Sequence, residues 1–438
     1  MIKKIMLIGL FTGLAHILSF YGVSFVVKMD ADKFFVSKIA EIESGIAIML
    51  AVMSFGLQQV ATRDIAINSD WTKILFITQQ NRFSMGLFLS VLGLFLYLLT
   101  KDSYYLIFLL APLLALNVDY ALYGRGHSVQ ASFLSLIKVG VPAVILVILG
   151  YIGLFELNIY IISIVVSWGI ISYFSNKILK AFLLIRPKLN FFKAYLKNIK
   201  IGFTDFALTV LKLGILTLAK PFYDETTIAN AFVVLKLYVL IKGVQRVIFQ
   251  AFYKDLVNPK KAFMIDKIGL LIGFLFFSVT LFYPTEITNF LFSKDYLSSK
   301  KLLTLVGIAT LISSISISIS PRMLLIRKDK EYINSYLFAL VGTLSFLVII
   351  SKTNMFFYGI IGAILFGEFI LNLLFFYHLK NVVFTKQRFL FLLELAGLFT
   401  IFSINFCFFN SPLSMFLSAV CCLFYGLYFL FQHKKQIL

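Results

Sequence analysis

Four basic residues lie inside long apolar runs of this sequence, where a charge is costly to keep. Lys212 interrupts one run, and Lys236, Lys242 and Arg246 interrupt the next. One charge near the centre of a bilayer costs about 2.5–3.5 kcal/mol on insertion scales, so four unpaired charges would cost on the order of 10 kcal/mol, as much as the whole stability of a domain. We therefore expect these side chains to face a wet cavity and to bind something negatively charged.

The spacing of three of these cations places them on one side of a helix. At 100° per residue, Lys236, Lys242 and Arg246 share a sector of about 120° with Gln250, and Tyr253 falls in the same sector. The two lysines lie near the middle of their run, too deep for their stems to reach water at the hydrocarbon edge. Fixed cations that face inward select an anion, and phosphate is the obvious one. We predict that the stripe binds phosphate.

Two further lysines extend this prediction to neighbouring runs. Asp205 and Lys212 fall on one face of their run, and Lys138 precedes Pro142 by four residues, where the proline bends a helix. An alternative reading stays open, because an acidic partner would neutralise a lysine and simply lock two helices together. The acidic residues available for such pairing are Asp119, Asp205, Glu368 and Glu394.

Composition places the chain among polytopic membrane proteins. Of 438 residues, 60% are hydrophobic and 14% are charged, whereas a soluble protein of this length would be about 25% charged. Ile5–Val27 is read as a signal anchor and first span. The sequence predicts an all-α fold with no soluble domain. The fourteen expected spans are 5–27, 34–58, 82–99, 103–124, 130–152, 157–177, 201–220, 226–252, 265–285, 302–325, 333–350, 356–379, 389–409 and 412–432.

Charge distribution predicts topology and domain organisation. Lys and Arg concentrate in alternate connections, which places both termini in the cytoplasm. The longest connection, 177–200, mixes basic and aromatic residues, and we expect an amphipathic helix on the anionic cytoplasmic leaflet, interrupted at Pro187. It separates a lobe of six spans, 1–176, from a second lobe, 201–380, with two appended spans in 381–438. A cavity between two such lobes is the expected substrate site.

Several functional classes lack their signatures. The sequence contains no Walker A glycine loop, so ATP is not expected to drive the protein. The three cysteines, Cys407, Cys421 and Cys422, fall in late apolar runs and form no disulfide or metal framework. No catalytic group and no cofactor are expected. A polytopic glycan polymerase or ligase would need a large external loop with catalytic basic residues, and no such loop is found.

Two stretches resemble a known family. Phe55–Ala66 reads FGLQQVATRDIA at the end of the second span, and Asn117–Gly126 reads NVDYALYGRG at the end of the fourth. Both resemble bacterial polysaccharide exporters of the MATE-like (MOP) flippase superfamily, in particular the Wzx-type O-antigen flippases of lipopolysaccharide biosynthesis. The resemblance implies a V-shaped pair of six-helix lobes. It also implies a cargo, an oligosaccharide on undecaprenyl diphosphate moved from the inner to the outer leaflet of the bacterial inner membrane.

The resemblance gives the charged residues expected roles. Diphosphate binding is expected at Lys236, Lys242, Arg246, Lys212 and Lys138, and cytoplasmic-side loading at Arg63 and Arg125. The alternative for Arg63 and Arg125, which their charge alone favours, is that they are plain positive-inside residues. Asp205 and Glu368 are the candidates for coupling to a proton or Na⁺. Tyr238 and Trp168 are candidates for stacking on sugars.

Alternatives from other classes stay open. A multidrug exporter of the same fold is the nearest, but its cationic drugs would need buried carboxylates. The lipid II flippase of the superfamily places an arginine in its first span, and here that span carries only His16, which is also readable as a helix-contact residue. A glycan polymerase or ligase and a non-transporting scaffold are the others. An O-antigen polymerase and a chain-length regulator are the expected protein partners.

Overall fold

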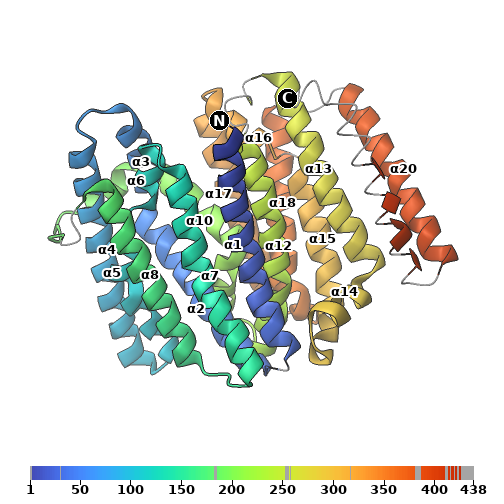
Figure 1. Cartoon of the computed structure of the whole chain (residues 1–438), viewed down its shortest axis with the longest axis horizontal. Coiled ribbons are helices and arrows are strands. Elements are labelled where there is room, and N and C mark those ends of the chain that lie inside the picture. Colours follow the sequence, from blue (N-terminus) through green and yellow to red (C-terminus); the bar gives the residue numbers. More distant parts are fainter. Residues whose placement is uncertain are drawn as a thin grey trace.

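Apolar runs become membrane-length helices throughout the computed structural model, which is shown in Figure 1. The structure describes residues 2–29, 31–181, 185–251, 256, 258–315, 317–379 and 386–409, with short pieces between 413 and 425. In this part of the chain, twelve helices are long and apolar enough to cross a membrane, or thirteen with one bent pair. No strand occurs there. The all-α polytopic fold predicted from the sequence is confirmed.

The helices follow the expected spans closely. Their bounds are α1 (Ile2–Lys28), α2 (Lys33–Ser54), α3 (Leu57–Ile67), α4 (Trp71–Thr100), η1 (Ser103–Leu110), α5 (Ala111–Ala115), α6 (Asp119–Gly124), α7 (Ser128–Ile152), α8 (Leu157–Leu179), α9 (Phe192–Lys197), α10 (Ile199–Thr209), η2 (Val210–Gly214), α11 (Ile215–Ala219), α12 (Glu225–Ala251), α13 (Pro259–Phe282), α14 (Pro284–Leu291), η4 (Lys294–Ser299), α15 (Lys300–Ser314), α16 (Ile319–Leu325), α17 (Asp329–Ile350), η5 (Phe356–Tyr358), α18 (Gly359–His378) and α20 (Lys386–Phe408). Most of the span expected over 412–432 lies outside the described residues.

The third span is longer than the sequence predicted. Helix α4 begins at Trp71 rather than at residue 82, because polar residues from Thr78 to Arg82 are buried in the protein and do not face lipid. Arg82 is 1% exposed and donates to the Asn117 carbonyl at 2.6 Å and to Gln79 Oε1 at 3.0 Å. The guanidinium thereby satisfies a carbonyl at the break between α5 and α6, where the helical ladder is interrupted.

The helix bundle has two ends, which contain different segments of the chain. The N-terminus and α3 lie at the top of Figure 1, and α14 lies at the bottom; we call these the upper and lower ends. Helix α1 packs on α7, and α17 packs on α18. Helix α2 contacts both α10 and α12 where the first spans meet the later ones. Helix α20 packs on α13 at the right-hand edge of the view.

The expected amphipathic helix of the 177–200 connection is reduced to a short one. Helix α8 ends at Leu179 and α9 covers only Phe192–Lys197, while 185–189 are not helical and 182–184 lie outside the described residues. Pro187 lacks the N–H that a continuous helix needs. The connection is held against α4, since the Lys188 amide donates to Ser84 Oγ at 2.7 Å. The described part of this connection outside α9 is therefore not the expected helix, and its position on the cytoplasmic leaflet stays a prediction.

Candidate functional site

A cavity of about 730 Å³ lies in the upper half of the bundle. It is walled by α2 and α3 on one side and by α10, α12, α16, α17 and α18 on the others. Five charged residues line it: Asp205, Lys212, Lys242, Arg246 and Glu368. Helix α2 belongs to the first six spans, whereas all five charged residues belong to later spans. The cavity thus lies between early and later spans and combines charged and apolar lining residues.

Lys212 lies at a break in the seventh span. Residues Val210–Gly214 form a π-turn between α10 and α11, and Lys212 has non-helical backbone angles (φ −130°, ψ −128°). Single π-turns within helices are common at functional sites, because they redirect a side chain and free backbone groups. Gly214 allows the turn to approach α2: a Cβ there would lie 2.9 Å from Ile48 Cδ1. The break places the lysine in the cavity wall.

Lys242 has a carboxylate partner in the cavity wall. Its Nζ lies 2.9 Å from Glu368 Oε1, and the Tyr238 hydroxyl donates to the same oxygen at 2.6 Å. The expectation that this lysine is unpaired is therefore wrong, and the pairing alternative holds for it. Glu368, a candidate for ion coupling, is the counter-ion. Tyr238 is fully buried, so the expectation that it stacks on sugars is also wrong.

Lys236 does not line the cavity among the described residues. It is 3% exposed, forms an ion pair with Glu43 of α2 and donates to Ser19 Oγ of α1 at 2.9 Å. Tyr160 of α8 donates to Glu43 at 3.1 Å. Sequence reasoning missed Glu43 as a partner, although a carboxylate in the apolar run 34–58 has the same desolvation cost as the lysines. Three helices of the first spans thus meet α12 through one buried ion pair.

Removing one member of this pair should destabilise the protein strongly. We expect Glu43→Gln to lower the free energy of unfolding by about 3–5 kcal/mol, because it leaves the Lys236 ammonium buried without a counter-ion. Adding Lys236→Met to Glu43→Gln should recover most of the loss, since no buried charge then remains. Thermal unfolding in detergent measures both variants. A double variant no more stable than Glu43→Gln would contradict this role for the pair.

Lys212 and Arg246 remain as cations without a direct ion-pair partner among the described residues. Both line the cavity. His16 of α1 lies against α12 beside them: a Cβ at Gly243 would meet its ring at 2.4 Å, which agrees with a helix-contact residue. The side chain of Gln250, and Tyr253 altogether, lie outside what the structure describes. On α12, Lys236 and Lys242 therefore have carboxylate partners, whereas Arg246 has none among the described residues.

Asp205 holds the bend between α2 and α3. Its carboxylate accepts from the Gly56 amide at 3.1 Å and from the Gln59 side chain. Gly56 has φ +79°, a conformation that favours glycine, and it is the N-cap of α3, where free amides attract a carboxylate. The two helices are bent by 55° there. Asp205 thus joins α10 to the FGLQQ stretch, and its role in ion coupling stays a prediction.

The two stretches that carried the family resemblance pack against each other. Gly124 lies on α3, where a Cβ would meet the Thr62 carbonyl at 2.8 Å. Arg63 is exposed and pairs with Asp64 at 3.2 Å. Arg125 is exposed and lies over the Trp71 ring at 4.8 Å. Neither arginine lines the cavity among the described residues. Both lie at the upper end, and their role in loading stays a prediction.

Lys138 and Trp168 lie together away from the cavity. The lysine Nζ is 3.8 Å from Asp119 Oδ2 and lies over the Trp168 ring at 5.0 Å. Trp168 is 4% exposed, so it does not stack on a substrate in this conformation. For Lys138 the pairing alternative therefore describes the structure, and its place in a diphosphate site is not supported by its position.

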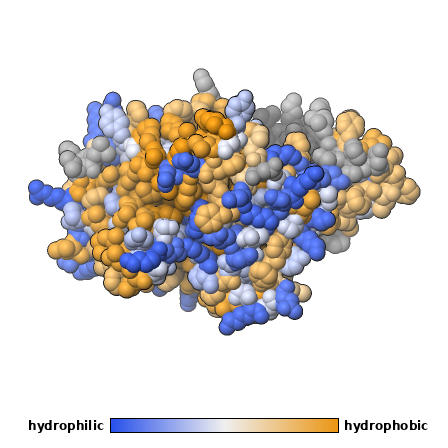
Figure 2. Space-filling view, turned by 90° about the horizontal axis from the view of Figure 1, so that it is seen from below, coloured by the Kyte–Doolittle hydropathy of each residue, from blue (hydrophilic) through white to orange (hydrophobic). Residues whose placement is uncertain are grey.

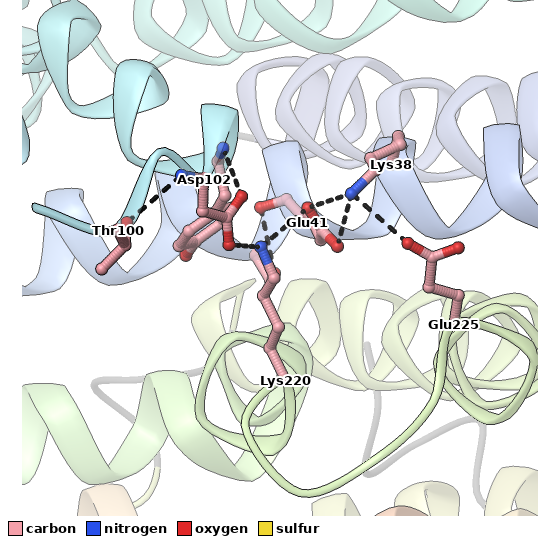
Figure 3. A network of polar contacts seen from close by, with 8 residues as sticks. Lys38, Glu41, Thr100, Asp102, Lys220 and Glu225 are labelled. Carbon is pink, nitrogen blue, oxygen red and sulfur yellow. Dashed lines mark hydrogen bonds and ion pairs between the residues drawn. The ribbon is translucent and has the colours of Figure 1, made fainter. Parts of the chain in front are cut away.

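An ion network closes the lower end (Figure 3). Lys220, which follows α11, lies 2.7 Å from Asp102 and 3.4 Å from Glu41 of α2. Lys38 of α2 lies 3.2 Å from Glu41 and 3.6 Å from Glu225 of α12. We call these five residues the lower network. Seen from below, hydrophilic residues gather across the middle of this face (Figure 2). The network joins early spans to later ones opposite the cavity.

The acid dependence of the lower network follows from Asp102. Partial burial alone would raise the pKa of its carboxyl, but hydrogen bonds from Lys220 and the Tyr104 amide outweigh burial and lower the pKa below the ordinary 3.8. A lowered folded-state pKa contributes stability above the unfolded value, which is lost as pH falls through the folded value. The midpoint difference in thermal unfolding between the native protein and Asp102→Asn should therefore be constant above about pH 5 and should shrink as the pH falls through the lowered folded-state pKa. Because Asp102 is partly exposed, the effect at neutral pH should be below about 1 kcal/mol.

Metal-ligand clusters are not found in the described residues, where no group of three His, Cys, Asp or Glu side chains is suitably placed. Cys407 and Cys421 are free, and Cys422 lies outside the described residues. Glu394 accepts from the Tyr425 hydroxyl at 2.8 Å and is remote from the cavity lining.

Comparison with solved structures identifies the fold. The chain is similar to the lipid II flippase MurJ in an inward closed conformation, with a TM-score of 0.71, 16% identity, and 99% of this chain and 100% of that chain covered. It is also similar to a multidrug resistance MATE family transporter of the MOP superfamily. The inward-facing form gives a TM-score of 0.60 at 15% identity, covering 84% and 94% of the two chains. The outward-facing form gives 0.56 at 14% identity, covering 87% and 95%. No family model and no curated protein matches the sequence.

Proposed function

We propose that this protein moves an oligosaccharide linked to undecaprenyl diphosphate across the bacterial cytoplasmic membrane by alternating access. The fold is that of MOP superfamily transporters, which supports transport as the class of function. The Wzx-type cargo comes from the sequence resemblance. Under this proposal the lobes are 1–176 and 201–380, both termini are cytoplasmic, and the upper end faces the cytoplasm. An O-antigen polymerase and a chain-length regulator are the proposed partners.

One observation is the main support for an anionic cargo. Lys212 and Arg246 line the cavity without a direct ion-pair partner among the described residues. The third cavity cation, Lys242, shares its charge with Glu368. Both acids of the wall are already engaged, Glu368 by Lys242 and Asp205 by Gly56 and Gln59. Neutral donors leave the charge of Asp205 in place, so three cations against two carboxylates give the cavity wall a net charge of +1. An entering diphosphate would supply the missing negative charge and accept charge-assisted hydrogen bonds.

A multidrug exporter of the same fold is the second candidate, favoured by Asp205 and Glu368 in the cavity wall. A cationic drug would need one of these carboxylates free. In this structure each accepts at least two hydrogen bonds or ionic contacts. A drug would also approach Lys212 and Arg246 against their charge. The physical argument therefore favours an anion.

The proposed mechanism uses the cavity in the upper half and the lower network at the opposite end. A head group enters the upper cavity while the lower network holds the opposite end together. The diphosphate binds Lys212 and Arg246 and competes with Glu368 for Lys242, while the polyprenyl tail stays in lipid. Separation of α2 from α11 and α12 at the lower network then opens the other side. An inside-negative potential favours outward movement of an anion by about 2.3 kcal/mol per charge per 100 mV.

Reconstituted transport tests this function. The purified protein in liposomes should move a polyprenyl diphosphate oligosaccharide, labelled on its sugar with a fluorophore that an impermeant reductant quenches. The matched control cargo is the same glycan on an uncharged polyprenol. We expect the diphosphate cargo to move much faster than the control. Transport of a cationic dye such as ethidium instead, or equal movement of both glycolipids, would overturn the proposal.

A further inference from the structure

A second cavity, separate from the charged one, opens on the lower half of the later spans. Its volume is about 730 Å³, and its walls come from α15, α17 and α18. Almost every lining side chain is apolar, including Ile308, Ile312, Phe346 and Phe366. We call it the lateral groove. It shares no lining residue with the charged cavity, so the proposed function does not account for it.

The lateral groove has the length of one leaflet. It runs along α15 from Lys301, near the lower end, to Ile312. Eleven residues at 1.5 Å per residue give about 16 Å of rise, and half of a 30 Å hydrocarbon core is about 15 Å. Met355 and Tyr358, in the turn between α17 and α18, line the same end as Lys301. The groove therefore extends from the polar interface to about the bilayer centre.

The chemistry of the walls suits hydrocarbon inside and an anion at the mouth. The Thr304 hydroxyl is satisfied by the carbonyls of Thr280 at 3.3 Å and Lys300 at 3.5 Å, so it does not call for water in the groove. The Phe346 and Phe366 rings stack with centroids 5.2 Å apart in its wall. An apolar space of this size stays dry, and its walls gain dispersion contacts only from an apolar guest. Lys301 is exposed and is the charged residue among those lining the groove.

We propose that the lateral groove binds an anionic phospholipid from the leaflet at the lower end, with one acyl chain between α15, α17 and α18 and the phosphate at Lys301. Lipid tails are as apolar as the walls, so the chain gains shape-dependent packing and no hydrophobic transfer energy. Selectivity must then come from the head group. A lysine near a membrane surface favours an anionic lipid by about fivefold. The site is a bound-lipid site of this chain and is independent of the transported cargo.

Two measurements test the site on the full-length protein. Native mass spectrometry with added phosphatidylglycerol or phosphatidylcholine should show preferential retention of phosphatidylglycerol, and Lys301→Gln should reduce that preference about fivefold. Lys300→Gln is the matched control, since this neighbouring lysine is exposed but does not line the groove. An equal reduction in both variants would mean diffuse surface attraction and would overturn the site.

Acyl-chain placement is tested separately. A phosphatidylglycerol with a photoreactive group at mid-chain should cross-link to peptides that contain Ile308, Phe346 or Phe366. Ile308→Trp, which fills the groove, should remove these cross-links and leave those on other membrane-facing helices unchanged. Thermal unfolding confirms that the variant is folded; if it is not, Leu305→Phe provides a second filling change. Cross-links spread evenly over the lipid-facing helices would overturn the proposal.

Discussion

Lys212→Gln combined with Arg246→Gln should reduce the transport rate of the diphosphate cargo by at least about 100-fold. Each cation can make charge-assisted hydrogen bonds worth about 1.5–3 kcal/mol, and about 1.4 kcal/mol corresponds to a factor of ten. Because neither side chain has an ion-pair partner among the described residues, the change leaves no carboxylate orphaned. Stability should therefore fall little, unlike in the Glu43→Gln variant. The liposome assay with the labelled glycolipid measures the rate.

The matched control changes the net charge equally outside the cavity. Lys197→Gln with Lys200→Gln removes two exposed cations at the upper end. This control should transport at a rate within about twofold of the native protein if binding in the cavity is decisive, since surface charges act mainly through screened long-range attraction. A similar loss in both double variants would show that general surface charge, and not the cavity pair, carries the effect. Retained transport in the Lys212 and Arg246 variant would remove the main support for an anionic cargo.

Lys220→Glu should open the lower end and close the upper one. The change places a third carboxylate beside Asp102 and Glu41, the latter 4% exposed. Lys220 and Asp102 are partly exposed and Glu41 keeps Lys38 as a partner, so the change should cost about 1.4 kcal/mol and lower the population of the conformation with the lower end closed about tenfold. In a background with Cys407, Cys421 and Cys422 replaced by serine, Thr217→Cys reports on this end. The Thr217 hydroxyl is buried one turn before Lys220, and its labelling by an impermeant maleimide should rise steeply.

A second reporter separates opening from unfolding. Leu50 lines the upper cavity, so Leu50→Cys should react more slowly in the Lys220→Glu protein if the two ends alternate. Unfolding would raise labelling at both positions. Lys352→Glu is the control, because Lys352 is an exposed lysine outside the lower network. Unchanged labelling of Thr217→Cys, or a parallel rise of both reporters, would contradict a gate at the lower network.

The fold was largely predictable because lipid imposes a simple rule. Every backbone polar group in hydrocarbon must be satisfied within its own segment, so apolar runs of about 20 residues become helices. Helix α7 begins at Ser128 and ends at Ile152, against the expected 130–152. The rule failed at α4, where Arg82 and its neighbours are polar yet buried. Hydropathy measures the preference of a side chain for lipid, and it does not distinguish residues that face lipid from residues that face protein.

The sequence predicted the cations that line the site, and it did not predict which of them form ion pairs. Sequence reasoning selected Lys212, Lys242 and Arg246, which line one cavity, because ionisable residues deep in apolar runs are costly to keep. It treated Lys236 in the same way, since one helical face is all that spacing along a helix can show. The structure places Lys236 against Glu43 and away from the cavity. Whether a charge is paired depends on residues 193 positions away in the chain.

The sequence by itself determined an all-α membrane protein, the approximate span limits, and the basic residues that must meet a counter-ion or water. Those properties depend on local composition, because burying a charge or an unsatisfied backbone group in hydrocarbon costs free energy at any position in the chain. Tertiary structure alone decided which cations are neutralised, where span seven breaks at Lys212, and that Lys220 joins α11 to α2 through Glu41. These depend on contacts between distant helices, whose packing is set by shape and by polar partners several spans apart.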